Sequence, residues 1–389
     1  KIYLKEGTYE PGAYISADSP YRDFFKFYNE DPGAWPDNGN YDGWWGHETL
    51  PKLNYEESVK LENYILRIGK KWVSPPYNVD GWRLDVAADL GMSKEYNHDF
   101  WKRFRMAVKS ANPQAIILAE HYGDPKEWLQ GDEWDTVMNY DAFMEPLTWF
   151  LTGMEKHSDF SRPDLCDNAD YFINSITHHM AAMPTPSLMT AMNELSNHDH
   201  SRFLTRTNHM VGRVDQLGHE AAEIYTNPAI MREAVVMQMT WVGAPTIYYG
   251  DEAGVYGFTD PDNRRTYPWG NEDKEMIAFH KEVIAIHKRY RAFRTGSLKM
   301  LTWEEGILAY ARFNDRRQFV VIVNNRSEAA TVRVPVWPAE IPMQGFMRRL
   351  IYTYDEGYTT EFEEYIIENG EIVLNMGKHS AIILKKREY

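Results

Sequence analysis

The stretch Asp80-Gly-Trp-Arg-Leu-Asp-Val-Ala-Ala-Asp89 decides the expected fold. Its apolar side chains alternate with Gly81, Arg83 and Asp85, which is the period of a β-strand that enters a packed core. Arg83 and Asp85 share one face of this strand, so the guanidinium can hold the carboxylate ionised and oriented. Such a carboxylate suits a nucleophile or a general base. The alternative for an isolated R-x-D pair is a buried ion pair that fixes strand register.

The chain on both sides of this strand alternates between two patterns. Helical spacing of apolar residues is found over 56–72, about 98–111, within 142–183, and over about 228–241 and 274–291. Buried strands are expected at 115–119, 134–139, 189–195 and 245–249. With the opening strand this makes five strands separated by helices, which predicts a parallel α/β arrangement.

Two further regions flank the α/β segment, which we assign to 56–296. Residues 1–55 are dense in Gly, Pro, Asp and aromatic residues and predict a long ordered loop region. After Gly296 the pattern changes to short alternating strands separated by turn residues, at 308–313, 319–324, 330–334, 349–354, 371–375 and 380–384. This pattern predicts an all-β sandwich domain over 297–389.

Composition narrows the class of ligand. The 389 residues carry a formal net charge of −15, which argues against a nucleic-acid or anionic-membrane partner. Cys166 is the single cysteine, so neither an internal disulfide nor a thiolate metal cluster can form. No apolar run reaches membrane-spanning length. Aromatic residues make up 14% of the chain, which fits a neutral ligand such as a sugar. The sequence assigns no cellular compartment.

Three acidic residues, Asp85, Glu120 and Asp199, stand at or just past the C-terminal ends of predicted strands. His121 and His198 are polar neighbours of the last two. In a closed parallel barrel these strand ends face one rim, so the three carboxylates would share one pocket. Mutual repulsion and burial would raise the pKa of at least one of them. Glycoside cleavage with retention needs one ionised and one protonated carboxyl, about 5–5.5 Å apart.

Four stretches together resemble successive signature blocks of the α-amylase family, glycoside hydrolase family 13. They are Asp80–Ala87, Ala119-Glu120, Asn197-His-Asp-His-Ser-Arg202 and Gly243-Ala-Pro-Thr-Ile-Tyr-Tyr-Gly-Asp-Glu252. Their order along the chain matches that of the family. The resemblance implies a (β/α)8 TIM barrel, in which the five predicted strands are the fourth to the eighth. Residues 1–55 would then be the loop domain that follows the third strand.

A narrower resemblance is carried by Leu50-Pro-Lys-Leu-Asn54, which is similar to the Met-Pro-Lys-Leu-Asn block of the branch with neopullulanase, cyclomaltodextrinase and maltogenic amylase. The segments 128–140 and 260–265 are also similar to that branch. Two departures affect the leaving-group side of the site. His121-Tyr122 follows the acid where the family usually has Trp and then His or Asn, and Ala88-Asp89 replaces an amylase-like Lys-His pair. Long-chain α-amylase specificity is therefore not implied.

The resemblance assigns roles to seven side chains. The nucleophile would be Asp85, the acid/base Glu120, and the aspartate that stabilises the transition state Asp199. Substrate contacts would come from Arg83, His198, Asp260 and Arg264.

The chemistry and the resemblance together predict a retaining hydrolase of α-1,4-glucosidic bonds in starch, maltodextrins or related α-glucans. The α-1,6 bonds of these glucans are additional candidate substrates. An α-glucan transglycosylase on the same site and a non-catalytic glucan-binding protein are the alternatives. The chemistry requires no cofactor. Structural calcium is a further possibility, because Asp37, Asn38, Asp42 and Glu48 could supply oxygen ligands. Ordinary turn formation explains these four residues at least as well.

One family block has no equivalent here. The family carries an Asp and an Asn-His pair at the end of the third barrel strand, and this block would precede Lys1. A barrel needs eight strands, and an open one would expose two buried edges. We therefore expect the chain to be the C-terminal part of a longer polypeptide. The missing N-terminal barrel segment is its expected partner, and activity could depend on it.

Overall fold

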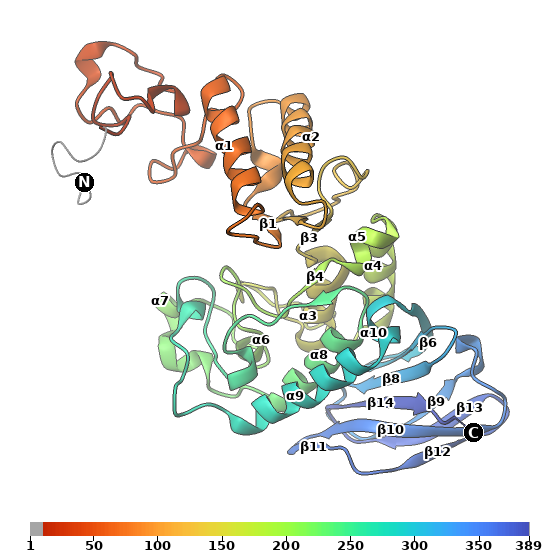
Figure 1. Cartoon of the computed structure of the whole chain (residues 1–389). Helices are drawn as coiled ribbons and strands as arrows, with labels where there is room; N and C mark the ends of the chain where they lie inside the picture. The colour runs from red at the N-terminus through yellow and green to blue at the C-terminus, as the bar shows by residue number, and fades with distance from the viewer. Residues whose placement is uncertain (1–10, 389) are drawn as a thin grey trace. The chain divides into compact units, whose positions relative to one another are not determined.

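A computed structural model describes residues 11–388, which belong to two compact units (Figure 1). The first unit holds the chain up to His121 together with Pro125–Val137, and the second holds Tyr122–Asp124 together with the chain from Met138 onward. This division falls inside the segment 56–296 that we assign to the barrel. The predicted domain bounds at 55 and 296 stay predictions.

The first unit begins with the loop region that the Gly- and Pro-rich sequence predicts. Over residues 11–58 the helical elements are three short 3₁₀ turns, η1 (Arg22–Phe24), η2 (Pro32–Ala34) and η3 (Trp44–Gly46). Phe24 and Phe27 are buried, and the ring of Phe27 packs against that of Trp35 at 5.2 Å. Aromatic packing therefore orders a segment that has little regular secondary structure.

Two helices and three parallel strands follow in this unit (Figure 1). Strand β1 (Gly81–Leu84) pairs in parallel with β2 (Ile116–Ala119), and β2 pairs with β3 (Thr136–Val137). The helices are α1 (Val59–Trp72) and α2 (Lys94–Ala111). Helix α2 begins four residues before the predicted start, because the Ser93 hydroxyl accepts a hydrogen bond from the Tyr96 N–H at 3.3 Å and caps the helix there.

The second unit contains the other two predicted parallel strands. Strand β4 (Met192–Asn193) pairs with β5 (Ala244–Pro245), and Met138 forms a parallel bridge with Met192. All five predicted strands are thus present, each shorter than its apolar run. The helices around them are the π-helical η5 (Tyr140–Met144), α3 (Glu145–Thr152), α4 (Ala169–Ala181), α5 (Thr185–Met189), α6 (Phe203–Arg206), α7 (Val214–Leu217), α8 (Pro228–Thr240), α9 (Lys274–Arg289) and α10 (Arg291–Thr295), with the 3₁₀ turns η6 (His219–Ala222), η7 (Asp251–Ala253) and η8 (Asp262–Arg264).

The rest of the second unit is the predicted β-sandwich. Its larger sheet is antiparallel and has the order β11-β10-β14-β8-β7-β6, with β12 also paired to β10. Its strands are β6 (Ser297–Glu304), β7 (Ile307–Phe313), β8 (Gln318–Asn324), β10 (Gly345–Tyr354), β11 (Gly357–Thr359), β12 (Glu364–Ile367) and β14 (Ser380–Lys386). The smaller sheet pairs β9 (Ala330–Pro335) with β13 (Glu371–Met376). The six predicted strands are confirmed, and β6, β11 and β12 were not predicted.

One hydrophobic core joins the two sheets. Ile322 and Ile382 of the larger sheet pack in the same cluster as Val334 and Ile372 of the smaller one, and all four are fully buried. Alternate residues of each strand supply this core, as expected for sheets packed face to face.

The other face of the larger sheet packs against α8. Every residue of α8 from Ala229 to Thr240 is buried, which confirms that its methionine-rich stretch is a core helix. At its C-terminal end the Thr240 and Tyr310 hydroxyls are hydrogen-bonded at 2.6 Å, and the rings of Trp241 and Tyr310 lie 4.8 Å apart. Helix and sheet are therefore joined by both polar and aromatic contacts.

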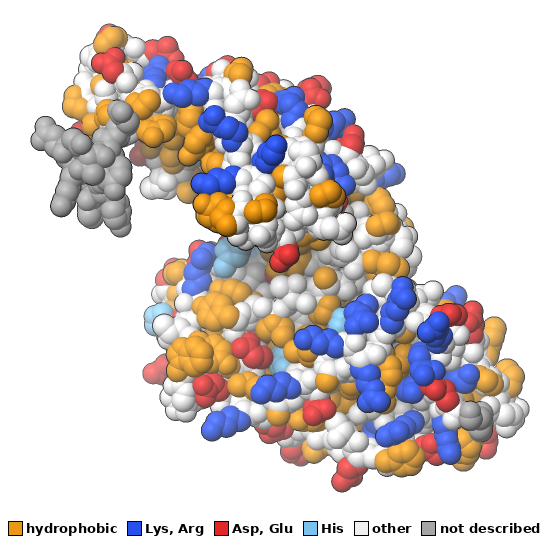
Figure 2. All heavy atoms as spheres, viewed as in Figure 1, with side chains coloured by type: hydrophobic (Ala, Val, Ile, Leu, Met, Phe, Trp, Pro, Cys, Tyr) orange, Lys and Arg blue, Asp and Glu red, His pale blue; other side chains and the backbone are white. Residues whose placement is uncertain are grey.

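The surface carries charges of both signs. On the face of the second unit drawn in Figure 2, Lys and Arg side chains are interspersed with Asp and Glu. Arg333 of β9 pairs with Glu371 of the neighbouring strand β13 at 2.8 Å, and Arg387, directly after β14, pairs with Glu364 of β12 at 3.0 Å. Among the described residues, no helix combines the length and the apolar character needed to cross a membrane.

Candidate active site

Strand register brings the first two candidate carboxylates together in the first unit. Leu84 and Ala119 are register partners at the C-terminal ends of β1 and β2. Asp85 and Glu120 follow directly, and the Glu120 N–H donates to the Leu84 carbonyl at 2.8 Å. Because the two strands are parallel, both side chains leave the sheet at the same edge.

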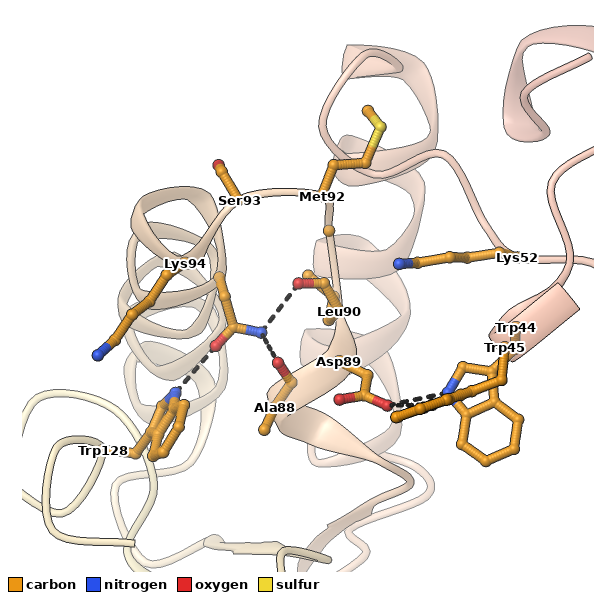
Figure 3. A pocket seen from close by; sticks show the side chains of 12 residues that line it. Trp44, Trp45, Lys52, Ala88, Asp89, Leu90, Met92, Ser93, Lys94 and Trp128 are labelled. Carbon is orange, nitrogen blue, oxygen red and sulfur yellow. Dashed lines mark hydrogen bonds between the residues drawn. The ribbon is translucent and has the colours of Figure 1, made fainter. Parts of the chain in front are cut away.

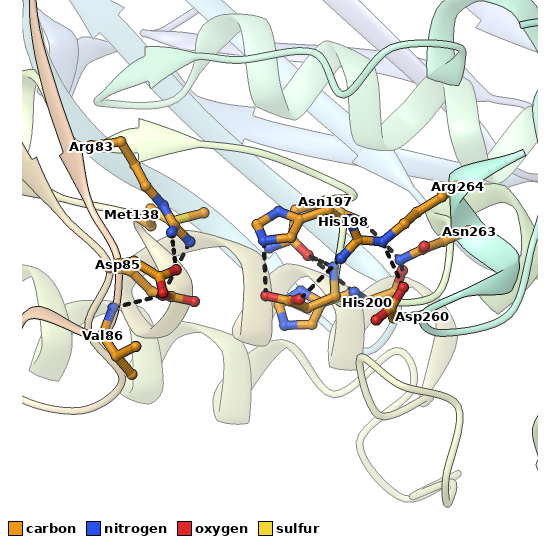
Figure 4. Close-up of polar contacts among 12 residues, drawn as sticks. Arg83, Asp85, Val86, Met138, Asn197, His198, His200, Asp260, Asn263 and Arg264 are labelled. Atoms are coloured by element: carbon orange, nitrogen blue, oxygen red, sulfur yellow. Dashed lines mark hydrogen bonds and ion pairs between the residues drawn. The ribbon is translucent and has the colours of Figure 1, made fainter. Parts of the chain in front are cut away.

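Arg83 contacts both carboxylates (Figure 4). Its guanidinium forms an ion pair with Asp85 and lies 3.1 Å from an Oε2 oxygen of Glu120. The side chain of Asp85 is 75% exposed, whereas that of Glu120 is 8% exposed. The predicted Arg83–Asp85 contact is confirmed, and the two acids have very different surroundings. That one of them has a raised pKa stays a prediction.

The turn after Asp85 differs from the predicted strand. Strand β1 ends at Leu84, and Val86 adopts left-handed backbone angles of φ 39° and ψ 45°. This conformation is strained for a β-branched residue. It directs the Val86 N–H to Glu120 Oε2 at 3.0 Å, so that oxygen contacts both Arg83 and the backbone (Figure 4). A strand extended through Val86, as the alternating pattern predicts, would not make this turn.

A buried asparagine that the sequence analysis did not select holds the next four residues. Asn97 of α2 donates its side-chain amide to the carbonyls of Ala87, Ala88 and Leu90, at 2.9–3.1 Å. Its own carbonyl accepts from the Trp128 indole at 2.9 Å. A buried asparagine on the apolar face of a helix was the available signal, because such a group needs partners.

Four further predicted residues meet in the second unit, in the loop after β4 and near η8 (Figure 4). His198 Nε2 lies 3.4 Å from Asp199 Oδ2, and Arg264 Nη2 lies 3.9 Å from Asp199 Oδ1. Arg264 also pairs with Asp260 at 2.5 Å. The structure therefore groups the predicted residues as Arg83, Asp85 and Glu120 in one unit and as these four in the other.

Two asparagines shape the loop that carries Asp199. The side-chain carbonyl of Asn197 accepts from the N–H groups of Asp199 at 2.9 Å and His200 at 3.0 Å. Asn263 donates to the carbonyls of Asn197 at 3.0 Å and His200 at 2.7 Å. Asn263 is fully buried and lies in the segment 260–265, where no sequence pattern predicted a role for it.

Arg202 connects three of the sequence blocks. Its buried guanidinium donates to Asp251 at 2.9 Å, to the Tyr249 carbonyl at 2.6 Å and to the Asn263 carbonyl at 2.9 Å. Burial raises the pKa of Asp251, which Arg202 opposes. The blocks that were recognised separately in the sequence thus meet around one buried arginine.

The family model described as "Alpha amylase, catalytic domain" matches residues 5–363. The chain belongs to the alpha-amylase family. A cyclomaltodextrinase of Geobacillus thermopakistaniensis is 32% identical over 324 residues, which cover 82% of this chain and 49% of that protein. Neopullulanase 2 of Thermoactinomyces vulgaris is 33% identical over 325 residues, with 82% and 48% covered. The chain thus spans about half the length of these relatives.

The fold comparison agrees with the family. The native form of a debranching enzyme from Nostoc punctiforme matches with a TM-score of 0.73 and 27% identity, over 94% of this chain and 70% of that one. The TIM-barrel fold with a C-terminal β-domain is therefore the architecture of this alpha-amylase family member.

His121 and Tyr122, which differ from the residues usual in the family at these positions, both make ring contacts in this structure. The His121 ring packs against those of Trp128 at 4.9 Å and Trp134 at 5.8 Å, within the first unit. In the second unit the Tyr122 ring stacks on Tyr140 at 4.3 Å, and its hydroxyl lies 3.1 Å from His200 Nε2. Burial holds the pKa of His200 well below its usual range, so this histidine is neutral at neutral pH.

The candidate calcium ligands make local contacts. Asn38 donates to the Asn29 carbonyl at 2.8 Å and accepts from the Asn40 N–H at 3.1 Å, and Asp42 accepts from the Tyr28 hydroxyl at 2.9 Å. Within residues 11–388, no group of three or more His, Cys, Asp or Glu side chains is arranged to hold a metal ion. Structural calcium at Asp37, Asn38, Asp42 and Glu48 stays a prediction, as does the turn-forming alternative.

Proposed function

We propose that this chain is a retaining glycoside hydrolase of α-1,4-glucosidic bonds in maltodextrins, starch or related α-glucans, with α-1,6 bonds as further substrates. The observation that carries the proposal is the contact of Arg83 with both Asp85 and Glu120, at the ends of two paired parallel strands. Two carboxyl groups that differ strongly in exposure and share one cation suit a division into nucleophile and acid.

In the proposed reaction, Glu120 gives its proton to the glycosidic oxygen while Asp85 attacks the anomeric carbon. The bond from that carbon to the leaving sugar breaks, and a covalent glycosyl-enzyme forms. Glu120, now ionised, takes a proton from water, and the hydroxide displaces Asp85 from the anomeric carbon. Each of the two displacements inverts the configuration of the anomeric carbon, so the product keeps the anomeric configuration of the substrate.

The residues of the second unit take the roles that the family resemblance assigns. Asp199 and His198 would bind sugar hydroxyls more tightly in the flattened transition state than in the ground state. Asp260 and Arg264 would contact the sugar on the non-reducing side of the cut. The Arg264–Asp260 and Arg264–Asp199 contacts support the idea that these side chains act as one group.

The names of the relatives support the substrate class. Proteins called cyclomaltodextrinase and neopullulanase resemble this chain over 82% of its length. We therefore extend the proposed substrates to cyclic maltodextrins and to pullulan. The Leu50–Asn54 block, which resembles this branch, points in the same direction.

The test is hydrolysis of maltoheptaose, β-cyclodextrin and pullulan by the full-length gene product and by its Asp85→Asn variant. Asn keeps the shape of the side chain but is a poor nucleophile, so we expect kcat to fall by at least about a thousandfold. Asp315→Asn is the matched control, because Asp315 is 84% exposed on the C-terminal domain. Proton NMR of the first product should show the α-anomer.

Several results would contradict this proposal. A β-anomer as first product would indicate inversion, and full activity of Asp85→Asn would remove Asp85 as the nucleophile. Products longer than the substrate would favour transglycosylation on the same site. Glucan binding without cleavage by the full-length gene product would favour the non-catalytic alternative.

A further inference from the structure

Each unit fixes the loop that carries one of the proposed catalytic carboxylates. In the first unit, hydrogen bonds to the carbonyls of Ala88 and Leu90 hold the turn that follows Asp85, beside a cavity of about 580 Å³ (Figure 3). In the second unit, the hairpin 154–161 is hydrogen-bonded to the loop that contains Asp199. The mechanism proposed above assigns no role to this hairpin.

Two hydrogen bonds attach the hairpin to the loop at Ser201. The Ser201 N–H donates to the Lys156 carbonyl at 3.0 Å, and the Ser158 hydroxyl donates to the Ser201 hydroxyl at 3.0 Å. Ser158 is fully buried and has a φ of 63°, in the left-handed region that a serine adopts only at a cost in free energy. Such strain persists only where the surrounding structure determines the conformation, and it concentrates near functional sites.

His157 of the hairpin reaches the backbone of Asp199 through one hydroxyl group. Its Nδ1 atom lies 2.8 Å from Thr259 Oγ1, and the Thr259 hydroxyl donates to the Asp199 carbonyl. A hydroxyl has a single proton, so the bond between His157 and Thr259 requires a proton on Nδ1 of the histidine. His157 therefore donates to Thr259, and Thr259 donates to Asp199. Thr259 is 3% exposed, which shields both bonds from water.

Thr259 also connects the two carboxylates that share Arg264. It directly precedes Asp260, whose N–H lies 3.4 Å from the same Asp199 carbonyl. Arg264 lies 3.9 Å from a carboxylate oxygen of Asp199 and 2.5 Å from one of Asp260 (Figure 4). A fixed Thr259 hydroxyl therefore fixes the backbone of both acids relative to one cation.

We propose that His157 and Thr259 are positioning residues, which hold Asp199 where its carboxylate acts on the sugar in the transition state. Neither side chain needs to touch the sugar. A displacement of a reacting group by about 1 Å can cost a factor of about 100 in rate, so the backbone bonds of Asp199 affect catalysis directly. The inference rests on the proposed function for the role of Asp199.

Steady-state kinetics of the full-length gene product on maltoheptaose tests this inference. Thr259→Val keeps the shape of the side chain but removes the hydroxyl. We expect kcat to fall about 10- to 100-fold with little change in KM, because the contact of Asp199 with the sugar is strongest in the transition state. Thr259→Ser keeps the hydroxyl and should stay within about threefold of the parent. His157→Ala should lower kcat as Thr259→Val does, and His157→Asn, whose amide can replace the Nδ1 donor, should recover most of the loss.

The double variant His157→Ala/Thr259→Val distinguishes a chain of hydrogen bonds from two independent supports. In a chain, the double variant should lose no more kcat than Thr259→Val alone. Thr295→Val is the matched control at an exposed threonine of α10 and should keep the parent kcat. Multiplied losses in the double variant, or a parent-like kcat of Thr259→Val, would overturn the inference. A loss that disappears when kcat is corrected for unfolded protein would overturn it as well.

Nitrogen NMR of histidine-labelled protein tests the hydrogen bonds without activity. The His157 Nδ1 atom should be protonated in the parent, and Thr259→Val should shift its resonance. An unprotonated Nδ1 would overturn the inference even in an active enzyme. Failure of the full-length gene product to hydrolyse any glucan would overturn the proposed function instead, and a His157 resonance that depends on Thr259 would then still support the positioning of Asp199.

Discussion

At the scale of single residues, Glu233 is the least expected side chain of the molecule. It lies in the centre of α8, is fully buried, and neither carboxyl oxygen has a hydrogen-bond partner among the described residues. Burial raises its pKa well above the ordinary value, the charge of Asp167 acts in the same direction, and Arg232 opposes it. The folded protein therefore keeps this carboxyl protonated at a pH where the unfolded chain ionises it.

We predict that Glu233→Gln reduces the pH dependence of stability. A folded-state pKa above the unfolded value means that the folded state binds the extra proton, so stability falls as pH rises from the unfolded pKa of about 4.3 toward the folded one. Gln stays neutral throughout. From pH 5 to pH 8, the difference in unfolding temperature between the variant and the parent should therefore change by about 2–4 °C in favour of the variant.

Thermal unfolding followed by circular dichroism at several pH values measures this difference. Glu282→Gln is the matched control, because Glu282 is an exposed glutamate on α9 of the same unit. Parallel pH curves for the parent and Glu233→Gln would show that the buried carboxyl does not titrate as we expect.

At the scale of elements, helix α2 positions the turn that carries the candidate nucleophile. The side-chain amide of Asn97 donates to three backbone carbonyls within residues 87–90, and the Trp101 indole donates to the Ala87 carbonyl at 2.9 Å. The turn itself contains the strained Val86. Without these bonds to α2, the polar groups of the turn would have to find other partners, and Asp85 would lose its fixed position.

We predict that Asn97→Ala lowers kcat on maltoheptaose by about 10- to 100-fold, with a much smaller change in KM. Asn97 acts through the turn, and a displacement of the nucleophile by about 1 Å costs a rate of this order. Steady-state kinetics on both constants tests the prediction, together with the unfolding temperature. Asn112→Ala, at the C-terminal end of the same helix, should change stability without lowering kcat. A loss of kcat in Asn97→Ala that disappears when corrected for unfolded protein would contradict a positioning role.

At the scale of the whole molecule, the C-terminal sheet and α8 form one structural block of the second unit. Arg312 of β7 is fully buried and donates to the carbonyls of Thr240 at 2.5 Å and Gly296 at 3.1 Å. Burial lowers the pKa of Arg312 to about 10, so it stays charged at neutral pH. Gln238 of α8 donates its side-chain amide to the carbonyl of Asn193 in β4 at 3.1 Å, and the loop after β4 contains Asp199.

We predict that Arg312→Met destabilises the second unit by about 2–4 kcal/mol, because methionine fills the space but leaves the buried carbonyls without their donor. Urea unfolding followed by circular dichroism measures the loss. Arg316→Met is the control at an 84% exposed arginine, and it should change the midpoint little. An unfolding midpoint of Arg312→Met equal to that of the parent would mean that the arginine does not join sheet and helix energetically.

Local sequence patterns determined the strands, the main helices and the places of the candidate acids. The period of two around Arg83 and Asp85, and the apolar run before Glu120, depend on neighbouring residues alone, so they can be read without a structure. The same holds for the β-sandwich. Element ends were less accurate, since β1 ends at Leu84, two residues before Val86, and α2 begins after a serine cap. The catalytic roles and the domain bounds stay predictions.

Only the tertiary structure decided which side chains meet. The bond of Glu120 to the Val86 N–H, the meeting of three blocks at Arg202 and the bond of His157 to Thr259 join residues 34 to 102 positions apart. No local period encodes such pairs, because they depend on how turns and strand ends are packed in space. The reason is physical: periodicity fixes which face of an element is buried, whereas the partner of each polar group is chosen by the fold.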